Sequence, residues 1–491
     1  MMHCNNHTCN PLQKQPTVNR GTLSKGLYDV ALFLGLKPEK TLFIHSTVVN
    51  DNKWSRKLFY KPSFSHSEIL SFMTRSPEGP KGIVLHVNHA LLNYLDQFGI
   101  APKNHYYLID QIPNRNQYPY FSVSGHLLNH LKENPEMISS LEGFHVVTSY
   151  LSEDDLKLVD LLSGRLLMSP EQQVPFNSKY YFRNLDSHYS FNMLPGVTFK
   201  GLSRLDLAMK QLKQILIDKK IPWQTAKIWC KFESQTSGNG SKCFTGFTSE
   251  NVLALSEHIL AFSDQLEMDF NYLTYDLPLV LELDVESLPN EVQVCNLGVE
   301  AVVGENSITF VGCVRQESRQ GKYVGSLIDP YSETFTSIAE ETAQPFLEAI
   351  HQEGYRGFMT IDVLLSKNLL SQEVTGYNID PNARFTAGTP LLSLIHHSRE
   401  MSGQNRYGLS YSNAVKNSPH LFNQILSYCG DHLYKGAQSN YCGIIPIILN
   451  DVTTMEGNKK YLRTVVIDET IEAASEKYDS FKSRILKDLS G

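Results

Sequence analysis

GYRGFMTIDVLLSKNLLSQEVTGYNIDPNARFTAGT, residues Gly354–Thr389, is the stretch that decides the fold. An apolar run at Ile361–Leu365, a polar turn and a second run at Val374–Ile379 predict two strands joined by a loop. Antiparallel pairing of these strands would place Asp362 and Asp380 opposite each other. The stretch therefore predicts a β-hairpin with two carboxylates on neighbouring strands.

Further polar side chains surround this acidic pair. Asn378 and Asn382 lie on the second predicted strand, and Arg384 follows it. Carboxylate and amide oxygens are the ligands that a hard cation prefers, and a guanidinium suits a phosphate group. An ordinary hairpin with a polar turn would have the same residues, so the stretch alone leaves both interpretations open.

The composition limits the classes of function. The chain has 491 residues with 44 Lys and Arg against 51 Asp and Glu, a formal net charge of −7. This length predicts two or three domains or subdomains. The acidic balance argues against general binding to nucleic acid or to an anionic membrane. No apolar run approaches the ~20 residues of a membrane span, and the first residues lack an apolar signal segment, so we expect a cytoplasmic protein.

The cysteines and the first residues suggest no disulfide framework and no closed metal site. Eight cysteines are scattered along the chain, mostly in apolar runs, which predicts buried free thiols. His3, Cys4, His7 and Cys9 are close enough in sequence to hold zinc, but their segment is polar and their spacing matches no closed site. We expect residues 1–20 to form a flexible tail.

Residues 21–178 alternate short β runs with helical patterns, which predicts a mostly parallel sheet covered by helices. The predicted strands are Thr41–His45, Ile83–Val87, Tyr106–Ile109, His145–Thr148 and Leu166–Met168. The predicted helices include Ala90–Phe98, Ser124–Leu131 and Glu153–Leu162. A Rossmann-like domain is the natural interpretation, although no G-x-G-x-x-G follows the first strand to support a dinucleotide site.

A glycine-rich loop, Ser237-Gly238-Asn239-Gly240, lies between two further predicted strands. Backbone N–H groups cradle phosphates, and glycine lets the backbone come close to them. Lys231 on the preceding strand and Lys179 at the start of a helix would each supply a point charge. Each feature is also ordinary by itself, since the loop suits a plain hairpin and either lysine suits a solvated surface.

Two predicted helices and one histidine pair complete the pattern. Thr334–Glu353 is apolar at helical spacing, and Pro345 within it predicts a kink or a break. Thr470–Leu489 carries an apolar stripe that predicts packing on the body of the protein. His396 and His397 would either face a substrate or lie at the surface.

The order of these elements resembles the ATP-grasp family. That family combines a Rossmann-like domain, two lysines, a glycine-rich loop, an acidic adenine-binding strand with a hinge, and paired acidic metal ligands. The resembling positions are Lys179, Leu194-Pro195-Gly196, Lys231, Ser237–Gly240, Glu282-Leu283-Asp284, Asp362 and Asn378/Asp380. The motifs cover about residues 175 to 395, and residues 21 to 175 agree by architecture only.

The resemblance implies an α/β (α+β) fold in three parts. A Rossmann-like pre-ATP-grasp domain would occupy residues 21–178. An ATP-grasp small subdomain with the glycine-rich flap would occupy residues 179–276. A large subdomain with the metal site and the last helix would occupy residues 277–491.

The resemblance also implies a nucleotide site with ATP as cofactor. Lys179 and Lys231 would hold the phosphates. Glu282 would accept a hydrogen bond from the adenine amino group, and the backbone of Leu283 or Asp284 would read the edge of the ring. The backbone that covers the phosphates would be that of Ser237, Gly238, Asn239 and Gly240.

The metal and the transferred group would be held nearby. Mg2+ would bind Asp362, Asn378 and Asp380, although the family usually has Glu-x-Asn where this chain has Asn378-Ile379-Asp380. That exchange leaves open whether one or two metal ions bind. The catalytic cations would be Lys231, Arg384 and Arg315, with Arg315 on the turn that borders the acceptor site.

The reaction implied is that of an ATP-dependent carboxylate–amine ligase. A carboxylate attacks the γ-phosphate to give an acylphosphate, and an amine then displaces phosphate to form an amide or peptide bond. The partners would be small carboxylates and amines, such as amino acids or peptides, and a homodimer is possible. A kinase, or a degenerate fold that binds a nucleotide or a partner without turnover, remains an alternative.

Overall fold

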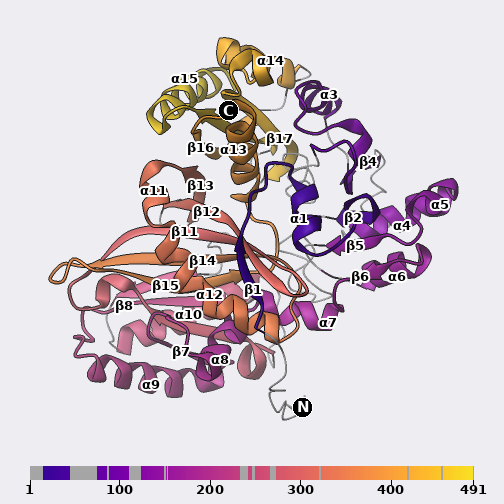
Figure 1. The fold of residues 1–491 in the computed structure, drawn as a ribbon. Helices are drawn as coiled ribbons and strands as arrows, with labels where there is room; N and C mark the ends of the chain where they lie inside the picture. The colour runs from indigo at the N-terminus through magenta and orange to yellow at the C-terminus, as the bar shows by residue number, and fades with distance from the viewer. Residues whose placement is uncertain are drawn as a thin grey trace.

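The computed structural model describes residues 15–44, 75–85, 88–109, 123–148, 151, 153–232, 241–245, 249–265, 272–319, 322–416, 418, 420–454 and 457–489. Within these residues the chain forms three β-sheets of five, four and nine strands, with helices packed around them (Figure 1). None of the helices described there combines the length and the apolar character that a membrane crossing requires.

The five-stranded sheet is parallel and has the strand order β4-β3-β2-β5-β6. Its strands are β2 (Thr41–Ile44), β3 (Lys81–Leu85), β4 (Tyr106–Ile109), β5 (His145–Thr148) and β6 (Arg165–Leu166). The helices of this region are α1 (Leu27–Phe33), α3 (His89–Gln97), α4 (Val123–Glu133), α5 (Glu136–Leu141), α6 (Glu153–Leu161) and α7 (Pro170–Gln173). Because the first strand of the sheet lies at its centre and the order reverses there, this is the Rossmann arrangement. Each of the five predicted strands has a counterpart, although the last is Arg165–Leu166 instead of Leu166–Met168, and residues 45 and 86–87 of the predicted strands lie outside the described residues.

The four-stranded sheet is antiparallel and has the order β7-β10-β8-β9. Its strands are β7 (Gly196–Lys200), β8 (Lys227–Phe232), β9 (Ser241–Thr245) and β10 (Pro278–Leu283). One face packs on α9 (Leu205–Asp218) and α10 (Ser249–Gln265), where Leu212, Ile259 and Leu281 share an apolar core. Since side chains alternate along a strand, the other face presents the remaining residues of β8 and β10.

The nine-stranded sheet has the order β15-β14-β11-β12-β13-β16-β18-β17, and β1 pairs with β12 beside this path. Its strands are β1 (Thr17–Arg20), β11 (Glu291–Val303), β12 (Ser307–Arg319), β13 (Lys322–Ile328), β14 (Gly357–Asn368), β15 (Val374–Asn382), β16 (Tyr407–Lys416), β17 (Gly443–Thr454) and β18 (Gly457–Asp468). Its helices are α11 (Pro330–Thr334), α12 (Thr336–Gln352), α13 (Thr389–Ser402), α14 (Leu421–Cys429) and α15 (Ile471–Leu489).

Helices α12 and α15 pack on this sheet as their apolar stripes predict. Phe346 and Ile350 of α12 lie in one core with Ile361 and Val363 of β14. Helix α12 continues through Pro345 as one element, so the predicted break does not occur. The predicted stripe of α15 is buried against β16 and β18.

Residues 17–20 are part of the large sheet. Thr17–Arg20 form β1, which pairs in parallel with Ser307–Phe310 of β12, and Arg20 makes an ion pair of 2.6 Å with Glu340. The expectation of a flexible tail up to residue 20 is therefore wrong for this strand. His3, Cys4, His7 and Cys9 lie outside the described residues.

One hydrophobic core joins the Rossmann-like domain to the end of the chain. Leu91 and Leu95 of α3 belong to the same core as Ile445 and Ile447 of β17. Figure 1 accordingly shows α3 beside α14 at one end of the molecule. His396 of α13 belongs to this junction, because its Nδ1 accepts the N–H of Leu23 at 3.0 Å and burial lowers the pKa of the imidazole to about 3. His396 is thus half-buried at this junction, where it binds the backbone of the N-terminal segment.

Candidate active site

Charged side chains gather where the small sheet faces the large one. Lys231 and Glu282 lie on the face of the small sheet that points away from α9 and α10, and they are only 6% and 2% exposed. Asp362 and Asp380 lie opposite each other on β14 and β15, as the hairpin predicts. Side-chain ion pairs connect the two sheets at this point.

The ion pairs form a continuous row. Lys231 Nζ lies 2.7 Å from Glu282 Oε1 and 3.7 Å from Asp380 Oδ1. Lys179 Nζ lies 3.1 Å from Asp380 Oδ2. Arg183 completes the row through an ion pair with Glu282 Oε2. Two carboxylates from different sheets therefore hold three cationic groups together.

Helix α8 (Lys179–Tyr189) supplies two of those cations. Ser178 caps the helix by accepting the N–H of Tyr181 at 2.9 Å, which fixes where the helix begins. Lys179 and Arg183 are four residues apart and so lie on the same side of the helix. Arg183 also donates to the carbonyl of Leu194 at 2.8 Å, and a Cβ at Gly196 would lie 2.9 Å from its Nη1. The predicted Leu-Pro-Gly turn thus packs on this arginine.

The row of ion pairs shifts the acidities of its members. Burial alone would lower the pKa of Lys231, but Asp380 and Glu282 together hold it above the usual value. Burial opposes the charge of Asp380 as well, yet Lys179 and Lys231 keep its pKa below the usual value. Burial and the neighbouring Asp380 raise the pKa of Asp362 to about 6, and the hydrogen bond from Gln316 and the charges of Lys179 and Arg384 offset only part of this effect.

Two amides bind Asp362. Gln316 of β12 donates to its Oδ1 at 2.6 Å, and Asn382 donates to its Oδ2 at 3.5 Å. Asp362 and Asp380 offer oxygen ligands of the kind that Mg2+ prefers, and Asp380 Oδ1 is buried without a hydrogen-bond partner. No group of three or more His, Cys, Asp or Glu in metal-binding geometry occurs in the part of the chain that the structure describes.

A β-bulge removes Asn378 from this group. Asp362 pairs with Asp380, but the next residue, Val363, pairs with Asn378, so Ile379 is an extra residue in β15. The bulge turns Asn378 to the α12 side of the sheet, where its amide donates to the carbonyl of Thr342 at 2.9 Å. The structure therefore does not place Asn378 with Asp362 and Asp380, contrary to the sequence expectation.

Arg315 of β12 also points away from the site, to the face of the large sheet opposite to Asp362. It pairs with Leu297, whose side chain belongs to the core under α12, and its guanidinium makes an ion pair of 2.9 Å with Asp329. Its neighbour Gln316 points to the other face and reaches Asp362. Alternation along the strand thus exchanges the predicted arginine for a glutamine at this position.

The backbone N–H groups of the predicted hinge, Leu283 and Asp284, already donate hydrogen bonds to neighbouring strands and loops. The N–H of Leu283 donates to the carbonyl of Pro195, and that of Asp284 to the carbonyl of Lys227, both at 2.9 Å. The Asp284 carboxylate accepts the indole N–H of Trp229 at 2.8 Å. Reading the adenine edge with either N–H would require these bonds to break. The flap residues Ser237, Gly238, Asn239 and Gly240 lie outside the described residues.

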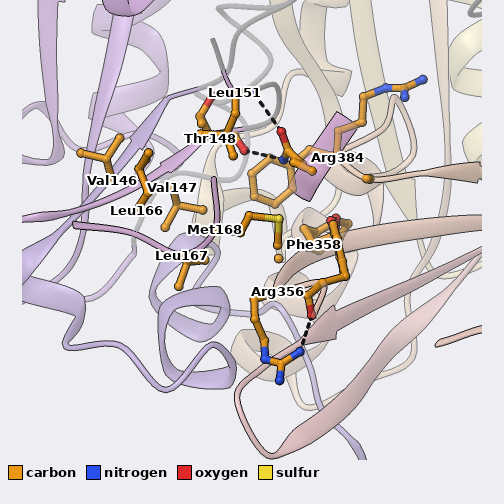
Figure 2. A pocket seen from close by; sticks show the side chains of 15 residues that line it. Val146, Val147, Thr148, Leu151, Leu166, Leu167, Met168, Arg356, Phe358 and Arg384 are labelled. Carbon is orange, nitrogen blue, oxygen red and sulfur yellow. Dashed lines mark hydrogen bonds between the residues drawn. The ribbon is translucent and has the colours of Figure 1, made fainter. Parts of the chain in front are cut away.

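Arg384 lies beside the hairpin, at a narrow crevice between the Rossmann-like domain and the large sheet. Its Nη1 donates to the side chain of Asn177 at 3.0 Å. Val146, Leu166 and Met168 line the crevice on one side and Phe358 on the other, and its interior has room for little more than a water molecule. Figure 2 shows the guanidinium of Arg384 extending away from the aliphatic side chains.

Glu300 of β11 is a buried acid near Asp362 that the sequence reading overlooked. Its side chain is 0% exposed, and its Oε1 accepts from the hydroxyls of Thr389 at 3.2 Å and Thr386 at 3.3 Å. Burial raises the pKa of this carboxyl to about 8, with Asp362 adding a smaller effect of the same sign. The signal in the sequence was an acidic residue inside an apolar run, GVEAVVG.

Arg183 was also overlooked in the sequence. Its position one helical turn after Lys179 was the available signal, since residues four apart share a face of a helix. Its partner Glu282 lies 99 residues further along the chain, so no local pattern could have joined the two.

Comparison with known proteins identifies the fold. No protein-family model and no curated protein matches the sequence at a significant level. Among solved structures, the biotin carboxylase of Campylobacter jejuni, in complex with β,γ-ATP, is 13% identical at a TM-score of 0.51, and the match covers 92% of this chain and 91% of that chain. The N5-carboxyaminoimidazole synthetase of Staphylococcus aureus, in complex with ADP, is 13% identical at a TM-score of 0.49, covering 91% of this chain and 98% of that chain.

The biotin carboxylase match extends over most of both chains. Biotin carboxylase has the ATP-grasp fold, in which a Rossmann-like domain precedes two facing sheets. At 13% identity the likeness concerns the fold alone. The chain thus has a Rossmann-like domain followed by a two-part ATP-grasp fold.

Proposed function

We propose that this protein is an ATP-dependent ligase that joins a carboxylate to an amine. The observation that carries the proposal is the convergence of Lys179 and Lys231 on Asp380, directly opposite Asp362. Lysines that converge in this way suit the phosphates of a nucleotide. The phosphates would replace the Asp380 carboxylate as the ion-pair partner of both lysines. The biotin carboxylase of the same fold was determined with an ATP analogue, which supports ATP as the nucleotide.

The side chains present also suit Mg2+. Asp362 and Asp380 would hold it, and Oδ1 of Asp380, which has no hydrogen-bond partner and only a 3.7 Å ion pair with Lys231, is an oxygen available for that purpose. A bound Mg2+ would neutralise charge on the phosphate oxygens. It would also weaken the hold of Asp380 on Lys179 and Lys231, so both ammonium groups could turn to phosphate.

In the proposed reaction a substrate carboxylate attacks the γ-phosphate of ATP and ADP leaves, which gives an acylphosphate. An amine then attacks the acyl carbon, phosphate leaves and the amine loses a proton, so that an amide bond forms. Lys179 and Lys231 would stabilise the charge that spreads over the transferred phosphoryl group. The hydrogen bond from Gln316 would hold the Asp362 carboxylate in its position beside the transferred phosphoryl group.

The test measures ADP release from MgATP against pools of amino acids, dipeptides and other small amines, each with and without added bicarbonate. Bicarbonate is included because a carboxylase shares the fold. Asp362→Asn should abolish release, whereas Glu373→Gln, an exposed acid on the same hairpin, should leave it unchanged. ADP release that needs no amine, or full activity of Asp362→Asn, would contradict the proposal.

A second candidate is a nucleotide-binding protein without turnover. Three observations favour it: Asn378 lies on the far face of β15, Glu282 is held by two cations, and the hinge N–H groups are bonded within the sheet. Calorimetric binding of MgATP with no ADP formation in any pool would support this candidate. A phosphorylated product in the mass spectrum would instead identify a kinase.

A further inference from the structure

A stripe of polar side chains crosses one face of the large sheet beside Asp362. Glu300 pairs with Thr360, and Gly298 pairs with Asp362, so all four residues lie on the same face. Gln316 of β12 reaches the same place through its hydrogen bond to Asp362. The apolar pair of Val302 and Phe358 bounds the stripe on one side, and on the other side Leu364, which belongs to a separate core, pairs with Asn296. The polar residues therefore form a confined patch next to the row of ion pairs.

Three buried atoms in and beside this patch have no hydrogen-bond partner, and one of them is Oδ1 of Asn296, which pairs with Gln316. Glu300 Oε2 and Thr360 Oγ1 are both buried and unpartnered, and both side chains are 0% exposed. The other oxygen of Glu300 is fully engaged by the hydroxyls of Thr386 and Thr389. Buried polar atoms are nearly always hydrogen-bonded, because leaving one without a partner forfeits its hydration. A pair of such atoms on neighbouring strands points to a ligand that donates hydrogen bonds.

The charged groups around Glu300 indicate what kind of ligand could donate hydrogen bonds to its open oxygen. No ion pair to Glu300 occurs among the described residues, although a fully buried acid normally has a cationic partner. Asp362, the nearest acid to influence it, adds negative potential. A divalent metal ion suits the place poorly, because Glu300 Oε2 and Thr360 Oγ1 are fewer oxygen ligands than such an ion takes. A cation with N–H donors would match the open oxygens and would supply the positive partner that an ionised, buried Glu300 needs.

We propose that Glu300 and Thr360 form the subsite for the amine co-substrate, where Glu300 Oε2 and Thr360 Oγ1 accept the N–H groups of a primary ammonium. This inference rests on the proposed ligase function, since it assigns the position of the second substrate in that reaction. The subsite lies beside Asp362, so an amine held there would stand next to the place proposed for the phosphates.

The crevice beside Arg384 borders the subsite. Phe358, which lines the crevice, is two residues before Thr360 on the same face of β14. Phe385, which also lines it, directly precedes Thr386, one of the hydroxyl partners of Glu300. The rings of Phe358 and Phe385 contact each other with centroids 4.6 Å apart. These two rings therefore belong both to the crevice wall and to the chain segments that carry Thr360 and Thr386.

The experiment measures the binding of n-butylammonium chloride to the full chain by saturation-transfer NMR, with 1-butanol as the uncharged probe of similar shape. Wild-type protein should bind the ammonium and not the alcohol. Glu300→Gln, which keeps a carbonyl oxygen for the two threonine hydroxyls, should weaken ammonium binding by about tenfold or more. Thr360→Val, which removes only an unpartnered hydroxyl, should weaken it by about threefold or more.

The matched control is Glu305→Gln on the turn after β11, where the side chain is 76% exposed, and it should bind as the wild type does. Equal ammonium binding by wild type and Glu300→Gln, or no binding by the wild type, would overturn the subsite. Loss of Mn2+ binding in Glu300→Gln would overturn it in favour of a metal ion. MgATP binding and ADP release are measured separately on the same variants. Saturable ammonium binding at Glu300 without any ADP release would therefore contradict the ligase function and leave the subsite standing.

Discussion

At the scale of single residues, Lys231 shows how the fold keeps a buried ammonium group charged. Its side chain is 8% exposed, and it remains charged because Glu282 and Asp380 lie on either side of it. Burial of either charge alone would be costly, since the desolvation of an ion is recovered only by close partners. Glu282 is central here because it pairs with both Lys231 and Arg183.

Glu282→Gln should therefore destabilise the small subdomain strongly. Two buried cations would lose a carboxylate, at a cost of about 3–5 kcal/mol. The matched control is Glu286→Gln, which removes a 2.5 Å ion pair with Lys227 at a well-exposed site and should cost about 0–1 kcal/mol. Urea unfolding followed by tryptophan fluorescence measures both, because Trp223 and Trp229 lie in this subdomain. Equal losses in the two variants would show that the buried pairs add nothing.

Glu300 should lower the free energy of unfolding as the pH rises, whereas an ion-paired acid with a depressed pKa raises it. Its pKa is about 8 in the folded protein against a usual value of 4.5, so between these values the folded state binds more protons than the unfolded state. Stability from this group is then fully present below the unfolded value and is lost as the pH rises through about 8.

Glu300→Gln, which cannot ionise, should consequently be more stable than the wild type at pH 9, by an amount on the order of a few kcal/mol. The difference should shrink towards pH 5. Unfolding measured at several pH values tests this, and a difference between the two proteins that does not change with pH would contradict the burial of an unpaired carboxyl.

At the scale of the element, the bulge in β15 decides which residues face the site. One extra residue, Ile379, sends Asn378 to the side of α12 while Asp380 stays opposite Asp362. Without the bulge, residues 378 and 380 would share a face, as the simple alternation of a strand predicts. Asn378 is consequently an anchor between β15 and α12.

Asn378→Ala should then lower stability and leave nucleotide binding unchanged. The lost hydrogen bond to Thr342 in a buried place should cost about 1–3 kcal/mol. Asp380→Asn should instead weaken MgATP binding, because it removes a proposed metal ligand, and it should also lower stability, because it removes the partner of two lysines. Thermal unfolding and calorimetry with MgATP separate the two effects. If a folded Asn378→Ala protein bound MgATP more weakly than the wild type, Asn378 would contribute to the site and the prediction would be wrong.

At the scale of the whole molecule, long-range pairing ties the parts together. Strand β1 joins the large sheet almost three hundred positions before its partner, with Thr17 opposite Ser307. The core shared by α3 and β17 links the Rossmann-like domain to the last strands. The site lies where the two ATP-grasp sheets meet, so its geometry depends on this assembly as well as on the hairpin.

Truncated proteins that begin at Gln15 and at Gly21 test the contribution of β1. The shorter protein lacks the strand and the Arg20–Glu340 ion pair, so its free energy of unfolding should fall by about 1–3 kcal/mol relative to the longer one. Thermal unfolding of the two proteins side by side is the measurement. Identical transitions would mean that β1 adds no stability to the sheet.

The sequence by itself determined the elements, the order of the sheets and the acidic pair. Strand alternation, helical periodicity and the hairpin pattern are local, so they could be read from neighbouring residues, and Asp362 and Asp380 face each other as that pattern predicts. Only the tertiary structure decided which side chains meet. Arg183 and Glu282 are far apart in the chain, the bulge reverses Asn378, and alternation puts Gln316 rather than Arg315 beside Asp362. These contacts depend on the packing of separate sheets and on one extra residue in a strand, which no local periodicity records.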